Sequence, residues 1–391
     1  MLGCGWKRNI NMNRLIIICL LFFLQSGYGQ VKDTLYGKVK ELSSYVTFQD
    51  SSIQNTKLFS TEGDYGHYGF YSKEFALSRW RSWWYNTYFV HYINLKKSFN
   101  ENGQLIDESW FYKNGSLVNR YKYVYDDKDR MISELEYSDY NPEEVDILNY
   151  GYKANGKLAV VLKTHIYNDY QRISLERLKY DIQDRIIRRD HINSKGEMSS
   201  SLIEYDSLKN VRKTFAYAED RWISSGERSH TLEEYPEGMK FIQFVDSLNE
   251  NENVVKRISY SERNYDNAVT PEQTSLYTYE NGKLIKVVRI DDNDADYINT
   301  FKYDDKNRLT EEIRTFNDRD VPIHLNQYQY DESDQVTKLN YYDNGFGKSG
   351  PEVIIVDFEI TYDDRDNWIE QKKIVNGKHL YTWRRDIEYW D

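Results

Sequence analysis

The sequence predicts an all-β protein, an elongated antiparallel β-sheet or β-solenoid built from tandem β-hairpin repeats. Three observations support this prediction. The chain has 36 tyrosines and only five prolines, and strands favour aromatic and β-branched side chains. Hydrophobic residues make up 39% of the chain, too many for a disordered chain. A short motif also recurs, as in "YDDKNRL" from Tyr303 and "YDESDQV" from Tyr330.

The recurring motif predicts hairpin turns. Counted from its tyrosine as position zero, position +4 is usually Asn, Asp or Gly, and position +6 is usually aliphatic. Asn, Asp and Gly tolerate a left-handed backbone, which a three-residue hairpin loop needs at its end. A loop of Asp305, Lys306 and Asn307 therefore pairs Tyr303 with Leu309 on one face of the sheet.

A second form of the turn supports the same register. The stretches "YKNGSL" from Tyr112 and "YENGKL" from Tyr279 are one residue shorter and carry Asn-Gly, which favours a two-residue type I′ turn. A loop of Asn281 and Gly282 pairs Tyr279 with Leu284. The shorter loop keeps the aromatic–aliphatic pair, which a register slip of one residue would break.

The repeats divide the chain into three parts. We predict a signal peptide at 1–29, an N-terminal strand with an aromatic-rich capping segment at 30–95, and a hairpin array at 96–391 that is irregular at about 217–274. Within the array, the turn tyrosines are at positions 125, 152, 180, 205, 279, 303, 330 and 362. The distance in sequence between most of these tyrosines fits one hairpin and the connection to the next. Such units can stack, and each then buries its apolar face against its neighbours.

The N-terminal segment predicts export. Basic residues precede the apolar run 15–24, and small residues Gly27 and Gly29 lie just before Gln30. This run is shorter than the roughly 20 residues that a membrane-spanning helix needs, so the pattern indicates a secretory signal peptide. An uncleaved anchor or a buried helix is the alternative. We expect the mature chain in a periplasm, at a cell surface or outside the cell, with no further membrane span.

Cysteine and charge exclude several classes of function. The two cysteines, Cys4 and Cys19, both lie in the segment that would be removed, and Cys19 follows Ile18 inside the apolar run, where no lipoprotein signal fits. The mature chain would therefore carry no disulfide or thiol site. Loss of three basic residues with that segment lowers the formal net charge from −11 to −14, which disfavours nucleic acid as a partner.

These repeats resemble the RHS/YD-repeat family, whose units read Tyr-Asp-x-x-Gly-Arg-Leu before a strand. The resemblance covers roughly residues 96–391 and is strongest to small exported proteins of this kind, which end in "YDDRDNWIEQ"- and "RRDIEYW"-like stretches as this chain does. Several units replace the motif glycine with Asp or Asn, and the unit of Tyr205 has Lys209 there. Large members enclose a toxin and release it by self-cleavage at an Asp-Pro motif, which this chain lacks. The resemblance therefore implies fold and export, without that activity.

One segment stands out as a candidate binding surface. The stretch 79–92 carries Trp80, Trp83, Trp84 and Tyr85, which we predict as a partner- or glycan-binding platform, because exposed aromatic rings stack on sugars or anchor proteins. The favoured alternative is a cap that packs under the first strands, since the ends of a solenoid need one. The sequence shows no catalytic motif, no cofactor site and no metal site.

The sequence predicts a non-catalytic, exported protein that acts as a binding or scaffold component of the cell envelope, with a protein or a glycan as partner. A glycan-binding protein would show an open aromatic groove, and a protein scaffold would show an apolar face too large to leave exposed. A glycan hydrolase with carboxylates from distant strands is one alternative. A protein associated with a secretion system or toxin is another, on resemblance alone.

Overall fold

The computed structural model describes residues 34–49, 94–112, 115–138, 143–196, 198–218, 239–262, 269–291, 297–316, 322–343 and 353–391. The predicted signal peptide and the four aromatic residues Trp80, Trp83, Trp84 and Tyr85 lie outside these ranges. In the described ranges, no helix is long and apolar enough to cross a membrane.

The described residues form one 22-stranded antiparallel sheet. Its strands are β1 (Val39–Phe48), β2 (Asn94–Phe99), β3 (Leu105–Phe111), β4 (Leu117–Tyr125), β5 (Met131–Ser138), β6 (Glu144–Tyr152), β7 (Leu158–Tyr167), β8 (Tyr170–Tyr180), β9 (Ile186–Ile192), β10 (Met198–Asp206), β11 (Val211–Ala218), β12 (Met239–Leu248), β13 (Val254–Glu262), β14 (Val269–Glu280), β15 (Lys283–Asp291), β16 (Tyr297–Tyr303), β17 (Leu309–Phe316), β18 (His324–Tyr330), β19 (Val336–Asp343), β20 (Ile354–Tyr362), β21 (Trp368–Val375) and β22 (Lys378–Tyr389).

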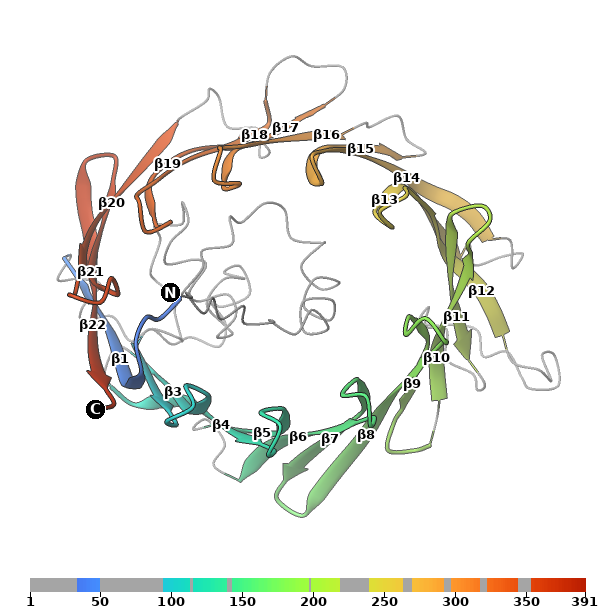
Figure 1. Ribbon diagram of the computed structural model, residues 1–391, viewed down its shortest axis with the longest axis horizontal. Helices are drawn as coiled ribbons and strands as arrows, with labels where there is room; N and C mark the ends of the chain where they lie inside the picture. Colours follow the sequence, from blue (N-terminus) through green and yellow to red (C-terminus); the bar gives the residue numbers. More distant parts are fainter. Residues whose placement is uncertain are drawn as a thin grey trace, which may run out of the picture.

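The sheet closes on itself into a barrel (Figure 1). Each strand pairs with its neighbours in sequence, and β1 pairs with both β2 and β22. The β1–β22 register places Leu42 opposite Ile387 and Phe48 opposite Tyr381. The predicted all-β class is confirmed, whereas the predicted elongated sheet or solenoid is wrong. Pairing of the first and last strands removes the open edges that a solenoid would have to cap.

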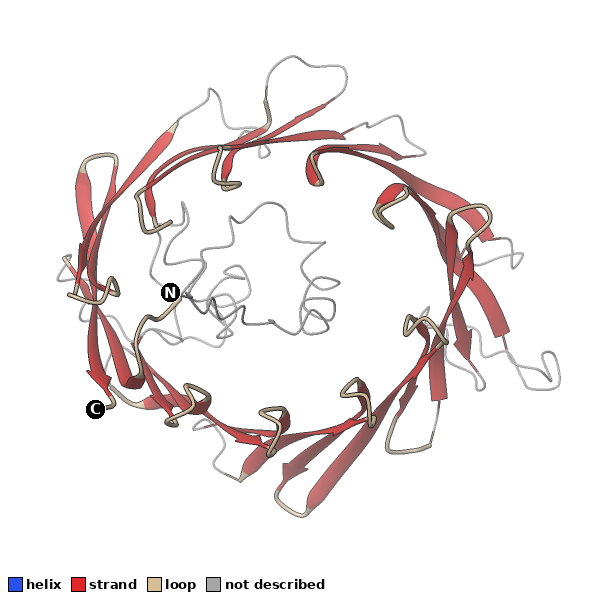
Figure 2. Cartoon of the chain, in the orientation of Figure 1, coloured by secondary structure: helices blue, strands red, loops and turns tan. Residues whose placement is uncertain are grey.

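The recurring turns form one rim of the barrel. They connect each even-numbered strand to the next odd-numbered one, from β2–β3 to β20–β21, so antiparallel order puts all of them at the same end. In the view down the barrel, most of these turns lie inside the ring of strands (Figure 2). The barrel therefore narrows towards this turn rim.

A β-bulge beside nearly every turn explains this narrowing. In the hairpin β16–β17, Tyr303 pairs with Leu309 but Lys302 pairs with Glu311, so Thr310 is an extra residue. The same shift precedes the turn tyrosine in the hairpins of Tyr125, Tyr152, Tyr180, Tyr279, Tyr330 and Tyr362. A bulge bends its strand and increases the local twist. Repetition of the bulge curves a sheet that hairpin periodicity alone would leave open.

The turn chemistry follows the sequence prediction. Asn307 has a φ of 68°, and the Asp304 amide donates to the Arg308 carbonyl at 3.0 Å. Both residues of the Asn281–Gly282 turn have positive φ, and Tyr279 pairs with Leu284 as predicted. Both predicted forms of the turn are thus confirmed on this rim.

The motif tyrosine links each hairpin to the one before it. Its hydroxyl usually donates to the backbone carbonyl of the preceding hairpin's aliphatic residue, as in Tyr303 to Leu284 at 3.0 Å and Tyr330 to Leu309 at 2.6 Å. The Tyr362 hydroxyl instead donates to the Asp331 carboxylate of the preceding turn. The motif arginine adds a second link, because Arg308 pairs with Asp304 at 2.7 Å and its guanidinium lies 4.7 Å from the ring centre of Tyr330. The turn rim is therefore held together by contacts of four motif positions, namely the Tyr, Asp, Arg and aliphatic residues.

Loss of one tyrosine hydroxyl should weaken this rim. On β14, Tyr279 donates to the Val254 carbonyl at 3.1 Å. We expect Tyr279→Phe to lower the free energy of unfolding by about 1 kcal/mol, since the Val254 carbonyl loses its donor. Tyr277→Phe on the same strand is the control, because its hydroxyl makes no hydrogen bond in the described part of the chain. Equal urea midpoints for the two variants would contradict the proposed link.

Two turns depart from the prediction. In the stretch from Tyr112, Tyr112 donates its amide to the Ser116 carbonyl and Phe111 pairs with Leu117, so this Asn-Gly turn is a three-residue loop, and it lies at the opposite rim. In the unit of Tyr205, the left-handed residue is Asn210, with a φ of 50°, instead of Lys209. One extra loop residue there keeps asparagine at the position that needs it.

The turn between β12 and β13 keeps the geometry without the tyrosine. Asn249 caps it in place of the motif aspartate, accepting from the amides of Asn251 and Asn253. Glu252 has a φ of 61° where other units have Asn, Asp or Gly. Because glutamate is strained in that region, we expect Glu252→Gly to raise the free energy of unfolding by about 1 kcal/mol. A lower urea midpoint for Glu252→Gly would contradict this account of the turn.

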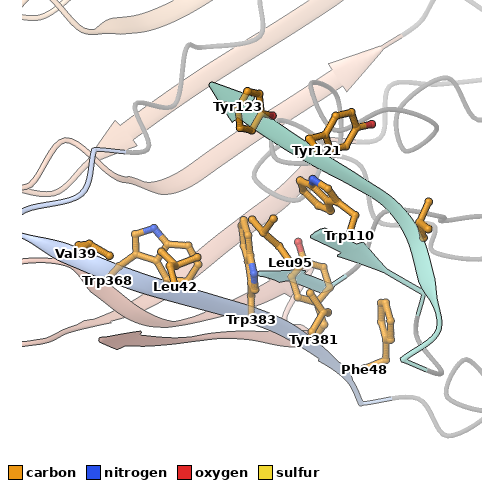
Figure 3. Packing of buried hydrophobic residues seen from close by; sticks show 12 residues of the cluster. Val39, Leu42, Phe48, Leu95, Trp110, Tyr121, Tyr123, Trp368, Tyr381 and Trp383 are labelled. Atoms are coloured by element: carbon orange, nitrogen blue, oxygen red, sulfur yellow. The ribbon is translucent and has the colours of Figure 1, made fainter. Parts of the chain in front are cut away.

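The best-packed part of the wall is the seam where β1 meets β22. Leu42, Trp110, Tyr381 and Trp383 are each at most 2% exposed, and their side chains point into the ring (Figure 3). The rings of Trp368 and Trp383 lie 4.7 Å apart, centre to centre. Burial of aromatic side chains from β1, β3, β21 and β22 in one cluster stabilises the closure.

Candidate functional site

The register of the strands divides the side chains of the wall into an inner and an outer face. Alternate residues of a strand point to opposite faces, and directly paired residues share a face. The inner face is the one that carries the seam cluster and the motif tyrosines.

A row of paired residues on the inner face carries an unusual set of charges. It crosses β11–β15, with Arg212 opposite Asp246, Asp246 opposite Arg257, Arg257 opposite Ser275 and Ser275 opposite Arg289. Neighbouring members are one strand spacing apart, about 4.8 Å. The row thus contains three arginines and one carboxylate, and we call these five residues the arginine row.

Two of these arginines hold the carboxylate between them. Asp246 is only 1% exposed, while Arg212 and Arg257 are 28% and 24% exposed. Arg257 donates through Nε and Nη2 to the two oxygens of Asp246 at 2.7 and 3.0 Å, and Arg212 Nη2 donates at 2.6 Å. The carboxylate is buried at the wall, and the two guanidinium groups reach from it towards solvent.

The positive charges of Arg212 and Arg257 keep the carboxyl of Asp246 ionised. Burial by itself would raise the pKa of Asp246, but the hydrogen bonds and charges of Arg257 and Arg212 lower that pKa below its ordinary value. The hydrogen bond from Arg257 to Asp246 raises the pKa of Arg257. Asp246 is therefore a fixed anion between fixed cations.

The third arginine has no such partner. In the ranges that the structure describes, Arg289 forms no ion pair or hydrogen bond. It pairs with Tyr297 of β16, which lies 4.7 Å from the ring of Phe316 on β17. Tyr205 pairs with Arg212 at the other end. The row is a basic strip with an aromatic residue at each end.

The inner face of β3–β7 has the opposite charge. Glu108 accepts from Tyr123 Oη at 2.8 Å and from Trp110 Nε1 at 2.9 Å, and Glu136 accepts from Tyr121 Oη at 3.0 Å. Farther along, Lys163 lies 2.8 Å from Asp146. The inner wall is therefore acidic over one arc and basic over another. These carboxylates are held by hydrogen-bond donors of the wall itself.

The outer face of the seam is charged. Ion pairs join Lys96 to Glu41 at 2.7 Å and Arg120 to Asp107 at 2.6 Å across neighbouring strands. On the other side of the seam, Arg384 lies 2.7 Å from Glu370. On β14 and β15 the outer face is more apolar, with Leu276 and Ile290 near 40% exposed. Charged side chains on the lipid-facing side destabilise a membrane barrel. The outer face around the seam is therefore better suited to contact with water than with lipid.

The predicted binding residues and the row are different parts of the chain. Trp80, Trp83, Trp84 and Tyr85 lie outside the described residues, so that prediction stays a prediction. In the described ranges, no group of three or more His, Cys, Asp or Glu could hold a metal ion. The sequence reasoning missed the arginine row, because Asp246 and Arg257 fall where the tyrosine period is lost. Arginines at inward positions of alternate strands were the available signal.

Acid should weaken the fold through these carboxylates. The pKa of Asp246 is lowered despite burial, and the pKa of the turn residue Asp304 is lowered by the backbone and side chain of Arg308. A carboxyl with a lowered folded pKa contributes stability above its unfolded pKa, about 3.9, and loses it as the pH falls through the folded value. We expect constant urea midpoints between about pH 5 and 7 and a steady fall below about pH 4. A midpoint unchanged at pH 3 would contradict these ion pairs.

Comparisons with known proteins do not assign a family. No family model matches the chain, and no curated protein matches it. Among solved structures, the chain is similar to TcdB2-TccC3-TEV, at 12% identity and a TM-score of 0.24, covering 74% of this chain and 18% of that one. It therefore spans about a fifth of that protein's length.

Two further structures are porin-like proteins. One, from Bacteroides uniformis, is 10% identical with a TM-score of 0.19, and the match covers 69% of this chain and 96% of that one. The other, from Bacteroides vulgatus, is 11% identical with a TM-score of 0.17, and the match covers 71% and 95%. TM-scores of this size carry no argument about fold or function.

Proposed function

We propose that this protein is an exported, non-enzymatic barrel that serves as a binding scaffold in an aqueous part of the cell envelope. The observation that carries the proposal is the outer face of the seam, where Lys96–Glu41 and Arg120–Asp107 form ion pairs. Such pairs suit water and would be costly in lipid. The basic segment and apolar run before residue 30 support export.

The inner wall supports a binding role. Its charged groups are held in place by the wall, as Asp246 is by Arg212 and Arg257. Rigid strands hold polar groups more accurately than loops do. The arginine row then presents fixed donors to a ligand inside the ring.

Cell fractionation tests this proposal. We expect the full-length chain, expressed in a Gram-negative host, to appear without residues 1–29 in the periplasmic or medium fraction. It should be soluble without detergent and should stay in the supernatant after carbonate washing and centrifugation. A deletion of residues 1–29 is the control and should remain in the cytoplasm. Recovery only from the membrane pellet, with release by detergent, would contradict the proposal.

A further inference from the structure

The arginine row contains a place for one more carboxylate. Arg212 and Arg257 lie on strands two apart, with Asp246 on the strand between them. Arg257 and Arg289 also lie on strands two apart, with Ser275 between them. The row thus repeats the arrangement of arginine, short polar residue, arginine. The second repeat has a hydroxyl where the first has a carboxylate.

The two repeats have matching dimensions. In both, the arginines are separated by two strand spacings, about 10 Å between α-carbons. In the first, that span lets both guanidinium groups bond one carboxylate at 2.6 to 3.0 Å. Because the backbone spacing is the same, a carboxylate beside Ser275 can accept from the Arg289 guanidinium and from Nη1 of Arg257.

The second repeat is short of an anion. Ser275 is 4% exposed and brings no charge, and Arg289 has no ion pair with any described residue. Arg257 uses Nε and Nη2 for Asp246, while its Nη1 bonds to no residue of the described ranges. Both arginines therefore keep donors that no described residue uses.

We propose that Arg257, Ser275 and Arg289 bind a carboxylate group of a ligand inside the barrel, and that this ligand is a uronate-containing glycan. This inference depends on the binding role proposed above and names its ligand class. Aromatic rings favour a sugar as the carrier of the carboxylate, since Tyr297 pairs with Arg289 and lies against Phe316. Tyrosine rings stack on the apolar faces of sugar rings and leave the hydroxyl groups free for hydrogen bonds.

Substitution at Ser275 offers a direct test. Ser275→Asp would place a carboxylate between Arg257 and Arg289, as Asp246 is placed between Arg212 and Arg257. We expect this variant to unfold at a higher urea concentration than the wild type and to lose ligand binding, because its own carboxylate occupies the site. A variant that has only lost its fold would unfold at a lower concentration, so the two causes of lost binding are distinguishable.

Calorimetry with a trimer of galacturonate measures the binding. The wild type should bind it, and Arg289→Gln should bind about tenfold more weakly, because a hydrogen bond to a charged group is lost. Lys286→Gln is the matched control, since it removes one positive charge from the outer face of the same strand. Methyl-esterified trimer, which lacks the negative charges, should not bind.

Three results would overturn the inference. They are no binding of the trimer by the wild type, equal binding by Arg289→Gln and wild type, or equal binding of a triglutamate peptide, which would exclude a glycan as the preferred class. None of these affects the fractionation result. A soluble, exported protein that ignores galacturonate would leave the proposed function standing and remove only the ligand class.

Discussion

Replacement of Asp246 by alanine is expected to lower the free energy of unfolding by about 3–5 kcal/mol. Asp246 is 1% exposed and is bonded by both Arg212 and Arg257. Removal of its carboxylate leaves two guanidinium groups at the wall with no counter-charge and lets them repel each other. Removal of one partner from a buried ion pair strongly destabilises a protein, because the other charge stays buried without a partner. Replacement of the whole pair by apolar residues often costs little stability.

The measurement is urea unfolding followed by tryptophan fluorescence and circular dichroism. Asp357→Ala is the control, because Asp357 pairs with Lys338 at 3.6 Å while 43% of its side chain is exposed. That substitution should change the free energy of unfolding by less than about 1 kcal/mol. Equal effects of the two alanine substitutions would mean that Asp246 is not the buried centre of a charged triad.

Replacement of Trp383 by alanine should have an effect of similar size, about 3–5 kcal/mol. Trp383 is 2% exposed and packs against Trp368 at the seam. The substitution removes a large ring from the cluster that holds the last strand against the first. We expect a lower urea midpoint and faster hydrogen exchange in β1 and β22, because the seam would open before the rest of the barrel.

The neighbouring residue provides the control. Arg384 is on the outer face of the same strand, is 50% exposed, and pairs with Glu370. Arg384→Ala should cost less than about 1 kcal/mol, because an exposed ion pair contributes little. A larger loss for Arg384→Ala than for Trp383→Ala would mean that the two faces have been assigned the wrong way round.

The turns of this fold could be predicted from the sequence, because they depend on neighbouring residues. Asn307 at position +4 predicts a left-handed residue, and the pairing of Tyr303 with Leu309 follows from loop length. The bulge at Thr310 could not be found in the same way, since one extra residue is easily absorbed into an alternating pattern. Because the bulges bend the strands, the curvature of the sheet could not be predicted either.

Closure and the candidate site depend on partners far apart in the chain. Residues of β1 and β22 meet although more than 300 positions separate them, as Phe48 and Tyr381 do. No local pattern in "VKELSSYVTF" says which strand covers its second edge. The arginine row likewise joins Arg212, Asp246 and Arg289 from separate strands, and only the register across β11–β15 places them together.

The seam between β1 and β22 also determines the order in which the barrel can fold. β1 has one partner close in the chain and a second partner, β22, that is synthesised after every other strand described. Hairpins linked by tyrosine hydroxyls can form early, because their contacts are local. Ring closure must instead bring together ends separated by most of the chain, which is entropically costly. Until that step, β1 and the most recently formed strand remain open edges to which other chains could add, so a slow final closure is the stage at which aggregation competes with folding.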